Sequence, residues 1–121
     1  MDSAVQAALA RGGVVDITTT GRQTGEARRI EIYLHSIDGR LVISGMPIPK
    51  KRAWLANVEA NPALTLHLKN GVTADLPATA RVVTDPVERR ELLVRVAATW
   101  KRTDVDTMVE WSPLMELTLA G

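Results

Sequence analysis

The chain has 121 residues, of which 45% are hydrophobic, and a formal net charge of +1; these values favour one packed core in a single domain over residues 1–121. It contains no cysteine, which excludes disulfides, thiolate chemistry and cysteine metal sites and is typical of a cytoplasmic protein. No apolar run approaches membrane-spanning length, and the first residues lack the pattern of a secretory signal, so we expect no transmembrane segment.

The N-terminal third predicts a helix followed by three strands. Residues 1–12 carry a weak apolar stripe that ends at a Gly-Gly pair, which indicates a short helix. Residues 14–20 are rich in β-branched side chains, and residues 29–37 alternate between apolar and polar side chains, so both segments predict strands. The Asp-Gly pair at 38–39 is a hairpin signal, and residues 40–44 form the expected return strand.

The middle of the chain predicts a helix and a second hairpin. A loop with two prolines over residues 45–49 precedes a helix expected over residues 50–59. Leucines alternate with polar side chains over residues 64–69, which predicts a half-buried strand. The Asn-Gly pair at 70–71 is a strong hairpin signal, and a long strand is expected over residues 72–83.

The C-terminal third predicts one strong helix and a last strand. Asp85 is the expected N-cap, Pro86 the first helical residue, and Glu88 completes a capping-box-like pair. Residues 103–106 read as a break or acidic turn, and a final strand is expected from residue 109 or 111 to residue 119.

About six strands and two or three helices result, with hairpins dominating. Because strands do not alternate regularly with helices, a doubly wound parallel sheet is disfavoured. The pattern predicts an α+β fold, a small antiparallel β-barrel with flanking helices. Barrels of this size are often too small to enclose a ligand, so a site is expected at the rim or between two subunits.

The most informative stretch for function is residues 17–29, Ile-Thr-Thr-Thr-Gly-Arg-Gln-Thr-Gly-Glu-Ala-Arg-Arg. Its glycines would let backbone N–H groups face a ligand, and the hydroxyls and arginines add donors. Such a turn suits a multiply charged anion such as a phosphate, and a solvated hairpin tip is the alternative. Residues 22–52 hold seven Lys/Arg and three Asp/Glu, a balance of +4. Because basic charge is focused on this segment, we expect a small anionic ligand rather than nucleic acid.

A second basic element, residues 50–52, lies at an expected helix N-terminus, where the helix dipole disfavours cations. A bound anion would neutralise both the basic cluster and the positive end of the helix dipole. A solvated surface cluster is the alternative. Trp54 on this helix is expected in the core or beneath a planar ligand. Tyr33 shares a strand face with charged residues, which points it towards a site. His35 and His67 lie on different strands without a metal-binding motif, so no metal site is expected.

Together these motifs resemble the deazaflavin-dependent nitroreductase family, which is similar to the flavin-binding split β-barrel proteins. The resemblance covers roughly residues 14–84 and rests on three runs: residues 17–29, Ile43-Ser44-Gly45, and residues 53–62 with the sequence Ala-Trp-Leu-Ala-Asn-Val-Glu-Ala-Asn-Pro. It implies a split barrel with flanking helices that binds the deazaflavin coenzyme F420. It also implies a tendency to form a homodimer, as in related flavin-binding members.

The resemblance further implies which residues bind the coenzyme. The Gly-Arg-x-Thr-Gly turn, the arginine after it and the loop before the Trp-containing helix do so in the family, and nearby lysines would help to hold the phosphate and the acidic tail. The expected cofactor-binding residues are Arg22, Gln23, Thr24, Gly25, Arg28, Ser44, Gly45, Lys50, Lys51 and Trp54. The expected catalytic residues are Tyr33 and Ser44, which would orient the substrate or relay a proton.

The sequence departs from the family pattern in three places. Gln23 stands where the family often has lysine. The loop after Ser44 is Gly-Met-Pro instead of a Lys-Gly-Gly-like sequence, and its basic residues are shifted to 50–52. The C-terminal region lacks the tyrosines that some relatives carry near the substrate.

The expected function is that of an F420-dependent oxidoreductase, which transfers a hydride between the deazaflavin and a small organic acceptor such as a quinone, a nitroaromatic or an activated alkene. One alternative is an FMN-binding oxidoreductase of the same fold. Another is a non-catalytic protein that carries a cofactor or another small ligand. The expected partner is a small-molecule substrate, and an apolar barrel face could support a homodimer.

Overall fold

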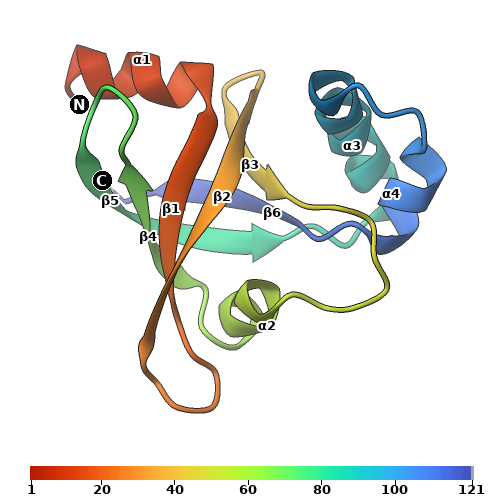
Figure 1. Cartoon of the computed structure of the whole chain (residues 1–121), viewed down its shortest axis with the longest axis horizontal. Helices are drawn as coiled ribbons and strands as arrows, with labels where there is room; N and C mark the ends of the chain where they lie inside the picture. The colour runs from red at the N-terminus through yellow and green to blue at the C-terminus, as the bar shows by residue number, and fades with distance from the viewer. Residues whose placement is uncertain (121) are drawn as a thin grey trace.

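The computed structural model describes residues 1–120, which form a closed barrel of six antiparallel strands and four helices (Figure 1). The strands are β1 (Gly13–Thr20), β2 (Ala27–Ile37), β3 (Arg40–Ser44), β4 (Ala63–Leu68), β5 (Ala74–Val82) and β6 (Leu114–Leu119). The helices are α1 (Ser3–Arg11), α2 (Ala53–Ala60), α3 (Pro86–Trp100) and α4 (Val105–Trp111). The predicted α+β antiparallel barrel with flanking helices is confirmed.

The barrel closes in the order β1-β2-β3-β6-β5-β4. β1 pairs with β2 from Gly13 opposite Leu34 to Thr20 opposite Ala27, and its other edge pairs with β4. The alternation read in the sequence of β2 buries Leu34 completely. In Figure 1, α1 lies at one end of the barrel, α2 lies at the other end near the β1–β2 turn, and α3 and α4 pack together at the side.

The predicted Gly-Gly stop of the first helix has a steric reason. Gly12 is the C-cap of α1 and has a φ of 66°, which is a conformation that favours glycine. A Cβ at this position would lie 2.4 Å from the carbonyl oxygen of Leu34 in β2. Glycine therefore lets the end of α1 approach the barrel closely.

Two apolar clusters stabilise the fold. The first fills the barrel and includes Ile17, Leu66 and Met115, all fully buried. The second lies between the barrel and the helices α3 and α4, and includes Leu93 and Met108, also fully buried. The side helices are therefore held by burial of apolar surface as well as by polar contacts.

The predicted break at 103–106 is confirmed only for residues 103–104, and the predicted strand start at 109 or 111 is wrong. Residues 105–111 form the helix α4, and β6 begins only at Leu114. Met108 points into the second apolar cluster. A segment this short fits the period of a helix or of a strand, and packing against α3 selects the helix.

Two further boundaries differ from expectation. The second helix begins at Ala53 instead of residue 50, because Arg52 is an extended N-cap residue. The long strand after the Asn-Gly turn begins at Ala74 instead of residue 72. The predicted start of α3 is confirmed: Asp85 accepts a 2.9 Å hydrogen bond from the backbone N–H of Glu88.

Hydrogen bonds from Arg89 connect α4 to α3 and to the end of β5. Its guanidinium donates hydrogen bonds to the carbonyl oxygens of Ser112 (2.6 Å), Val109 (2.9 Å) and Val83 (3.0 Å). Two of these carbonyls belong to the last turn and the C-cap of α4, where backbone acceptors lack partners within the helix. Burial lowers the pKa of Arg89, and the guanidinium remains charged because its pKa is so high in water.

A four-residue ion cluster joins α3 to the barrel and makes stability depend on acid pH. Glu88 accepts from Arg81 (2.6 Å) and Arg40 (2.7 Å), and both arginines also contact Glu116. The arginines lower the pKa of Glu88 from 4.5 to about 2. A carboxylate with a depressed folded-state pKa stabilises the fold above its unfolded pKa, and this stabilisation is lost as pH falls.

We therefore expect the free energy of unfolding to decrease between pH 4.5 and about 2, with Glu88→Gln making that dependence shallower. Urea unfolding at a series of pH values measures it. Glu91→Gln, at an exposed position of the same helix, is the matched control. A wild-type slope in Glu88→Gln would contradict the assignment.

His35 makes the stability of the fold depend on pH in a second, less acidic range. It is buried between Tyr33 and Trp100, with ring centroids 4.8 Å away in each case, and its Nε2 makes no hydrogen bond with the described residues. Burial lowers its pKa from 6.5 to about 4. Because the unfolded chain binds the proton first, stability should fall as pH drops from 6.5 to about 4. His35→Phe should remove this loss, as urea midpoints on both sides of the interval would show.

Candidate functional site: a basic pocket between the β1–β2 turn and α2

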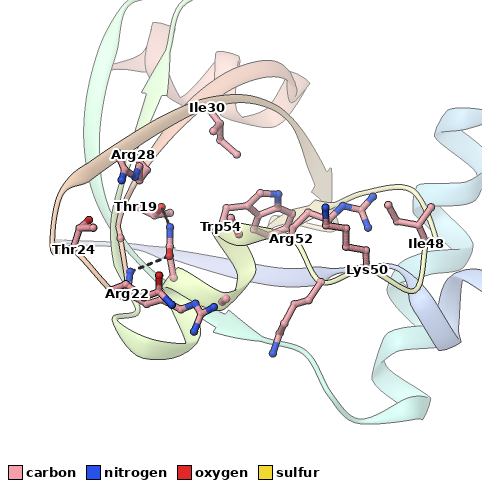
Figure 2. Close-up of a pocket in the computed structure, with 15 residues that line it drawn as sticks. Thr19, Arg22, Thr24, Arg28, Ile30, Ile48, Lys50, Arg52 and Trp54 are labelled. Atoms are coloured by element: carbon pink, nitrogen blue, oxygen red, sulfur yellow. Dashed lines mark hydrogen bonds between the residues drawn. The ribbon is translucent and has the colours of Figure 1, made fainter.

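A pocket of about 650 Å³ opens between the β1–β2 turn and α2 (Figure 2). This volume is within the range of small-molecule and cofactor sites. Its lining comes from β1, β2, the turn between them, the loop before α2, and α2 itself. The lining residues are Thr19, Gly21, Arg22, Gln23, Thr24, Arg28, Ile30, Ile48, Lys50, Lys51, Arg52, Ala53, Trp54, Ala56 and Asn57.

Cations dominate the polar lining. Arg22 and Arg28 come from the turn side, and Lys50, Lys51 and Arg52 come from the segment before α2 (Figure 2). None of the lining residues is acidic. The structure thus brings together the two basic elements that the sequence holds far apart.

Several of these cations have partners of their own. Arg28 contacts Glu26 at 3.2 Å, and Lys51 contacts Glu59, in both cases between half-exposed side chains. Such surface pairs contribute little and can exchange for another anion. Arg52 donates to the carbonyl oxygen of Met46 at 2.7 Å, and burial lowers its pKa.

The turn itself has a fixed shape. The N–H of Gly21 donates to the carbonyl of Glu26 at 2.7 Å, and the N–H of Gly25 donates to the carbonyl of Gly21 at 2.8 Å. Gly25 has a φ of 73°, which favours glycine. Gln23 and Thr24, at the tip of this turn, line the pocket, whereas Gly25 shapes the turn without being part of the lining.

Asn57 connects the turn to α2, and the sequence interpretation missed it. Its side chain is buried, accepts from the N–H of Arg22 (3.1 Å) and donates to the hydroxyl of Thr19 (3.1 Å); Figure 2 draws both bonds as dashed lines. The residue stands in the run 53–62 that carries the family resemblance. An asparagine on the buried side of an apolar helix was the available signal, because a buried amide needs partners.

Asn57→Ala should therefore lower the free energy of unfolding by about 1–3 kcal/mol, because the Arg22 N–H and the Thr19 hydroxyl lose their partner. Chemical denaturation measures the change. Asn61→Ala is the matched control, since Asn61 follows the same helix but is exposed and bonds only locally, to the N–H of Ala63. Equal destabilisation by both variants would argue against a connecting role.

Trp54 lies in the core, one of its two expected places, and also borders the pocket. It is 9% exposed and belongs to the barrel core, and the same side chain lines the pocket. With Ile30 it supplies an apolar wall across from the cations of the turn (Figure 2). The pocket thus combines a planar apolar surface with a basic rim.

Besides Gly25, three predicted site residues lie outside this lining: Ser44, Gly45 and Tyr33. The Ser44 hydroxyl is buried and donates to the carbonyl of Pro113 at 2.7 Å. Gly45 adjoins it, and a Cβ there would lie 3.1 Å from Pro113 and 3.2 Å from the Arg52 guanidinium. Tyr33 packs near His35 and Trp100 and lines a different, smaller cavity.

The lining chemistry fits a ligand that has several negative charges at one end and a planar apolar part at the other. Within residues 1–120 no group of His, Asp and Glu is arranged to hold a metal ion. No helix of the described chain is long and apolar enough to cross a bilayer.

Comparison with solved structures gives the same barrel. An F420-H2 dependent reductase (FDR-A) superposes with a TM-score of 0.65 at 22% identity, covering 87% of this chain and 93% of that one. A conserved hypothetical protein from Mycobacterium tuberculosis gives a TM-score of 0.75 at 16% identity, covering 100% and 81%. A structure described as a domain-swapped dimer gives 0.67 at 18% identity, covering 96% and 95%. At these identities the similarity shows the split-barrel fold.

The family is shown by sequence. The model of the F420H(2)-dependent quinone reductase family matches residues 2–110. This range contains the turn, the segment before α2, and Asn57, and so includes the whole lining of the basic pocket. The chain therefore belongs to the F420H(2)-dependent quinone reductases, a family of oxidoreductases whose coenzyme is F420.

Proposed function

We propose that the basic pocket binds F420 and that the chain transfers a hydride between this coenzyme and a small organic acceptor. The observation that carries the proposal is a pocket lined by five Lys/Arg side chains and no carboxylate, with an indole at its side. F420 has a phosphate and an acidic tail joined to a planar ring system. The cation set fits the charged part, and the apolar wall fits the ring.

Roles follow from position in the pocket. Arg22 and Arg28 would hold the phosphate, and the donors of the turn tip, Gln23 and Thr24, would add hydrogen bonds. Lys50 and Lys51 would hold the acidic tail. The bound coenzyme supplies the hydride chemistry, and the residues supply orientation and charge.

The apolar wall and the buried loop have supporting roles in this proposal. Trp54 would face the ring system, and Gly45 permits the Arg52 guanidinium to approach the loop. Ser44 would act as a positioning residue, because its hydroxyl is occupied by Pro113. Tyr33 lies outside the pocket lining, so we assign it no contact with the coenzyme.

The acceptor is a quinone, a nitroaromatic or an activated alkene in this proposal. A smaller cavity of about 190 Å³ shares Ile48, Lys50, Lys51 and Arg52 with the basic pocket and is bordered by Trp111 and Ser112. The Ser112 hydroxyl is buried and has no hydrogen-bond partner within residues 1–120. The indole of Trp111 at the border of this cavity supports binding of a flat molecule.

We also propose a cytoplasmic homodimer. The absence of cysteine supports the location, and the relative described as a domain-swapped dimer supports self-association. Light scattering of the purified protein tests the subunit count.

A fluorescence titration with F420, with FMN in parallel, tests the proposed coenzyme. We expect F420 to bind at micromolar or lower concentration and FMN, which has a single phosphate and no acidic tail, to bind more weakly. Preferential FMN binding would support the flavin alternative. Tight F420 binding without turnover across quinones, nitroaromatics and activated alkenes would support a non-catalytic carrier.

A further inference from the structure

We propose that a polar cavity between α1, β2 and α3 binds a small oxyanion, of the size of phosphate or a short carboxylate. The cavity has a volume of about 100 Å³, which leaves room for a few water molecules or one small ion. It shares no lining residue with the basic pocket, so the proposal holds whether or not that pocket binds F420. The polar residues in its lining are Arg11, Tyr33, His35, Ser36, Arg95 and Thr99.

The buried imidazole of His35 indicates that this cavity holds a ligand. His35 is 4% exposed, and its Nε2 atom has no hydrogen-bond partner within residues 1–120. A buried polar atom of this kind usually contacts a bound ion or a water molecule. Because burial lowers the pKa of His35 to about 4, the ring is uncharged at neutral pH and offers one N–H donor. An oxyanion accepts the hydrogen bond that this N–H donates.

The charge of the lining favours an anion as that ligand. Two arginines, Arg11 and Arg95, line the cavity, and no carboxylate does. Arg11 is exposed and takes part in no ion pair within residues 1–120. Arg95 contacts Asp38 at 2.9 Å, but both side chains are at least half exposed, and such a pair can exchange for another anion. The planar guanidinium groups match the oxygen spacing of carboxylate and phosphate.

The fold holds these groups around the cavity. In Figure 1, α1 and α3 lie on either side of the β2–β3 hairpin, at the end of the barrel away from α2. The absence of a side chain at Gly12 lets the end of α1 lie against β2, where a Cβ would come within 3.4 Å of the Ser36 nitrogen. On the other side, the Trp100 ring of α3 packs on His35 with 4.8 Å between ring centroids. These contacts within the chain fix the shape of the cavity, so an ion binds a site that is already formed.

A larger cavity against α3, of about 570 Å³, lacks this combination. Its lining includes the carboxylates of Asp38 and Glu91. Its arginines Arg40 and Arg90 are paired with carboxylates, and neither of the unpartnered buried atoms found within residues 1–120 belongs to it. The unpartnered imidazole and the lack of carboxylates therefore distinguish the small cavity as the anion site.

Titration of the purified chain with sodium phosphate and, separately, with sodium acetate tests the proposal. The readout is proton–nitrogen NMR of the histidine rings at neutral pH, with the His35 signals assigned by their loss in His35→Phe. We expect the His35 signals to shift and saturate with at least one of the two ions, while those of His67, outside the cavity, stay in place. Arg11→Ala should weaken binding about tenfold or more, because one charge-assisted hydrogen bond is lost. Arg90→Ala, which removes an exposed arginine of α3 outside the cavity, is the matched control and should bind like the wild type.

The outcomes also separate this site from the basic pocket. The variant Arg22→Ala with Arg28→Ala should keep the His35 response, and loss of that response would show that the ion acts from the basic pocket and would overturn the proposal. No saturable shift with either ion, which would leave water as the occupant, would overturn it too, as would wild-type affinity in Arg11→Ala. Saturation by phosphate alone would identify a phosphate site, and saturation by acetate alone a carboxylate site. F420 affinity should stay unchanged in Arg11→Ala, since Arg11 lies outside the basic pocket.

Discussion

Replacing Arg89 with methionine is expected to lower the free energy of unfolding by about 3 kcal/mol or more, since each hydrogen bond from a charged donor contributes about 1.5–3 kcal/mol. Methionine retains much of the length of the apolar stem and removes the guanidinium that donates to Ser112, Val109 and Val83. Two of those acceptors are at the C-terminal end of α4, where a cation also interacts favourably with the helix dipole. The loss should therefore weaken the attachment of α4 to α3, which the burial of Met108 also supports.

Urea denaturation measures this effect, and Arg90→Met is the matched control. Arg90 is the next residue of α3, but it is exposed and bonds only to the exposed carboxylate of Asp106, so its loss should cost less than about 1 kcal/mol. Equal unfolding midpoints for the two variants would show that the bonds to α4 contribute no net stability. Residual folded signal in Arg89→Met should show altered tryptophan fluorescence, because Trp111 ends α4.

Removing Arg22 and Arg28 together should weaken F420 binding about 100-fold or more. Each arginine would give a charge-assisted hydrogen bond to the phosphate, and each such bond is worth about 1.5–3 kcal/mol, or at least about tenfold in affinity. Arg28→Ala should have the smaller effect alone, because its side chain is half exposed and paired with Glu26. Fluorescence titration of both single variants and the double variant measures the changes.

Arg95→Ala is the matched control for the two pocket arginines. Arg95 is a half-exposed arginine that pairs with Asp38 and lies outside the basic pocket. Its removal should leave F420 affinity unchanged and stability nearly so. Wild-type affinity in Arg22→Ala and Arg28→Ala would mean that the coenzyme binds elsewhere on the chain.

The strands were predictable because their periodicity is local. Residues 29–35 alternate, and β2 follows that alternation as far as Leu34, which is fully buried; beyond it His35 and Ile37 are buried as well. The hairpin pair Asp38-Gly39 lies between β2 and β3, and both of its residues have positive φ. Where one face of a strand is buried, the hydrophobic pattern of its sequence sets the register in which it pairs with its neighbours.

Helix α4 could not be predicted in the same way. Val105, Met108 and Val109 suit a short helix or a short strand equally well, and seven residues are too few for intrinsic propensity to decide. Burial of Met108 and the hydrogen bonds from Arg89 decide it. Both are contacts between segments separated in sequence.

The sequence predicts that basic residues form a site, but it does not predict which residues come together to line the pocket. Arg22, Arg28, Lys50 and Lys51 were visible as two clusters, but their convergence depends on the barrel. Asn57 escaped notice because its bonds reach residues 35 and 38 positions away. The sequence does not reveal that the Ser44 hydroxyl is already occupied by a hydrogen bond to the carbonyl oxygen of Pro113.

The order of the strands also has a consequence for synthesis on the ribosome. β6, the last strand to emerge, is the shared neighbour of β3 and β5. Until it is translated, those two strands each present a row of unpaired backbone groups, which are templates for pairing with other chains. The nascent protein is therefore most prone to aggregation just before Leu114 leaves the exit tunnel, and a message truncated upstream of that codon yields a product with two permanently open edges.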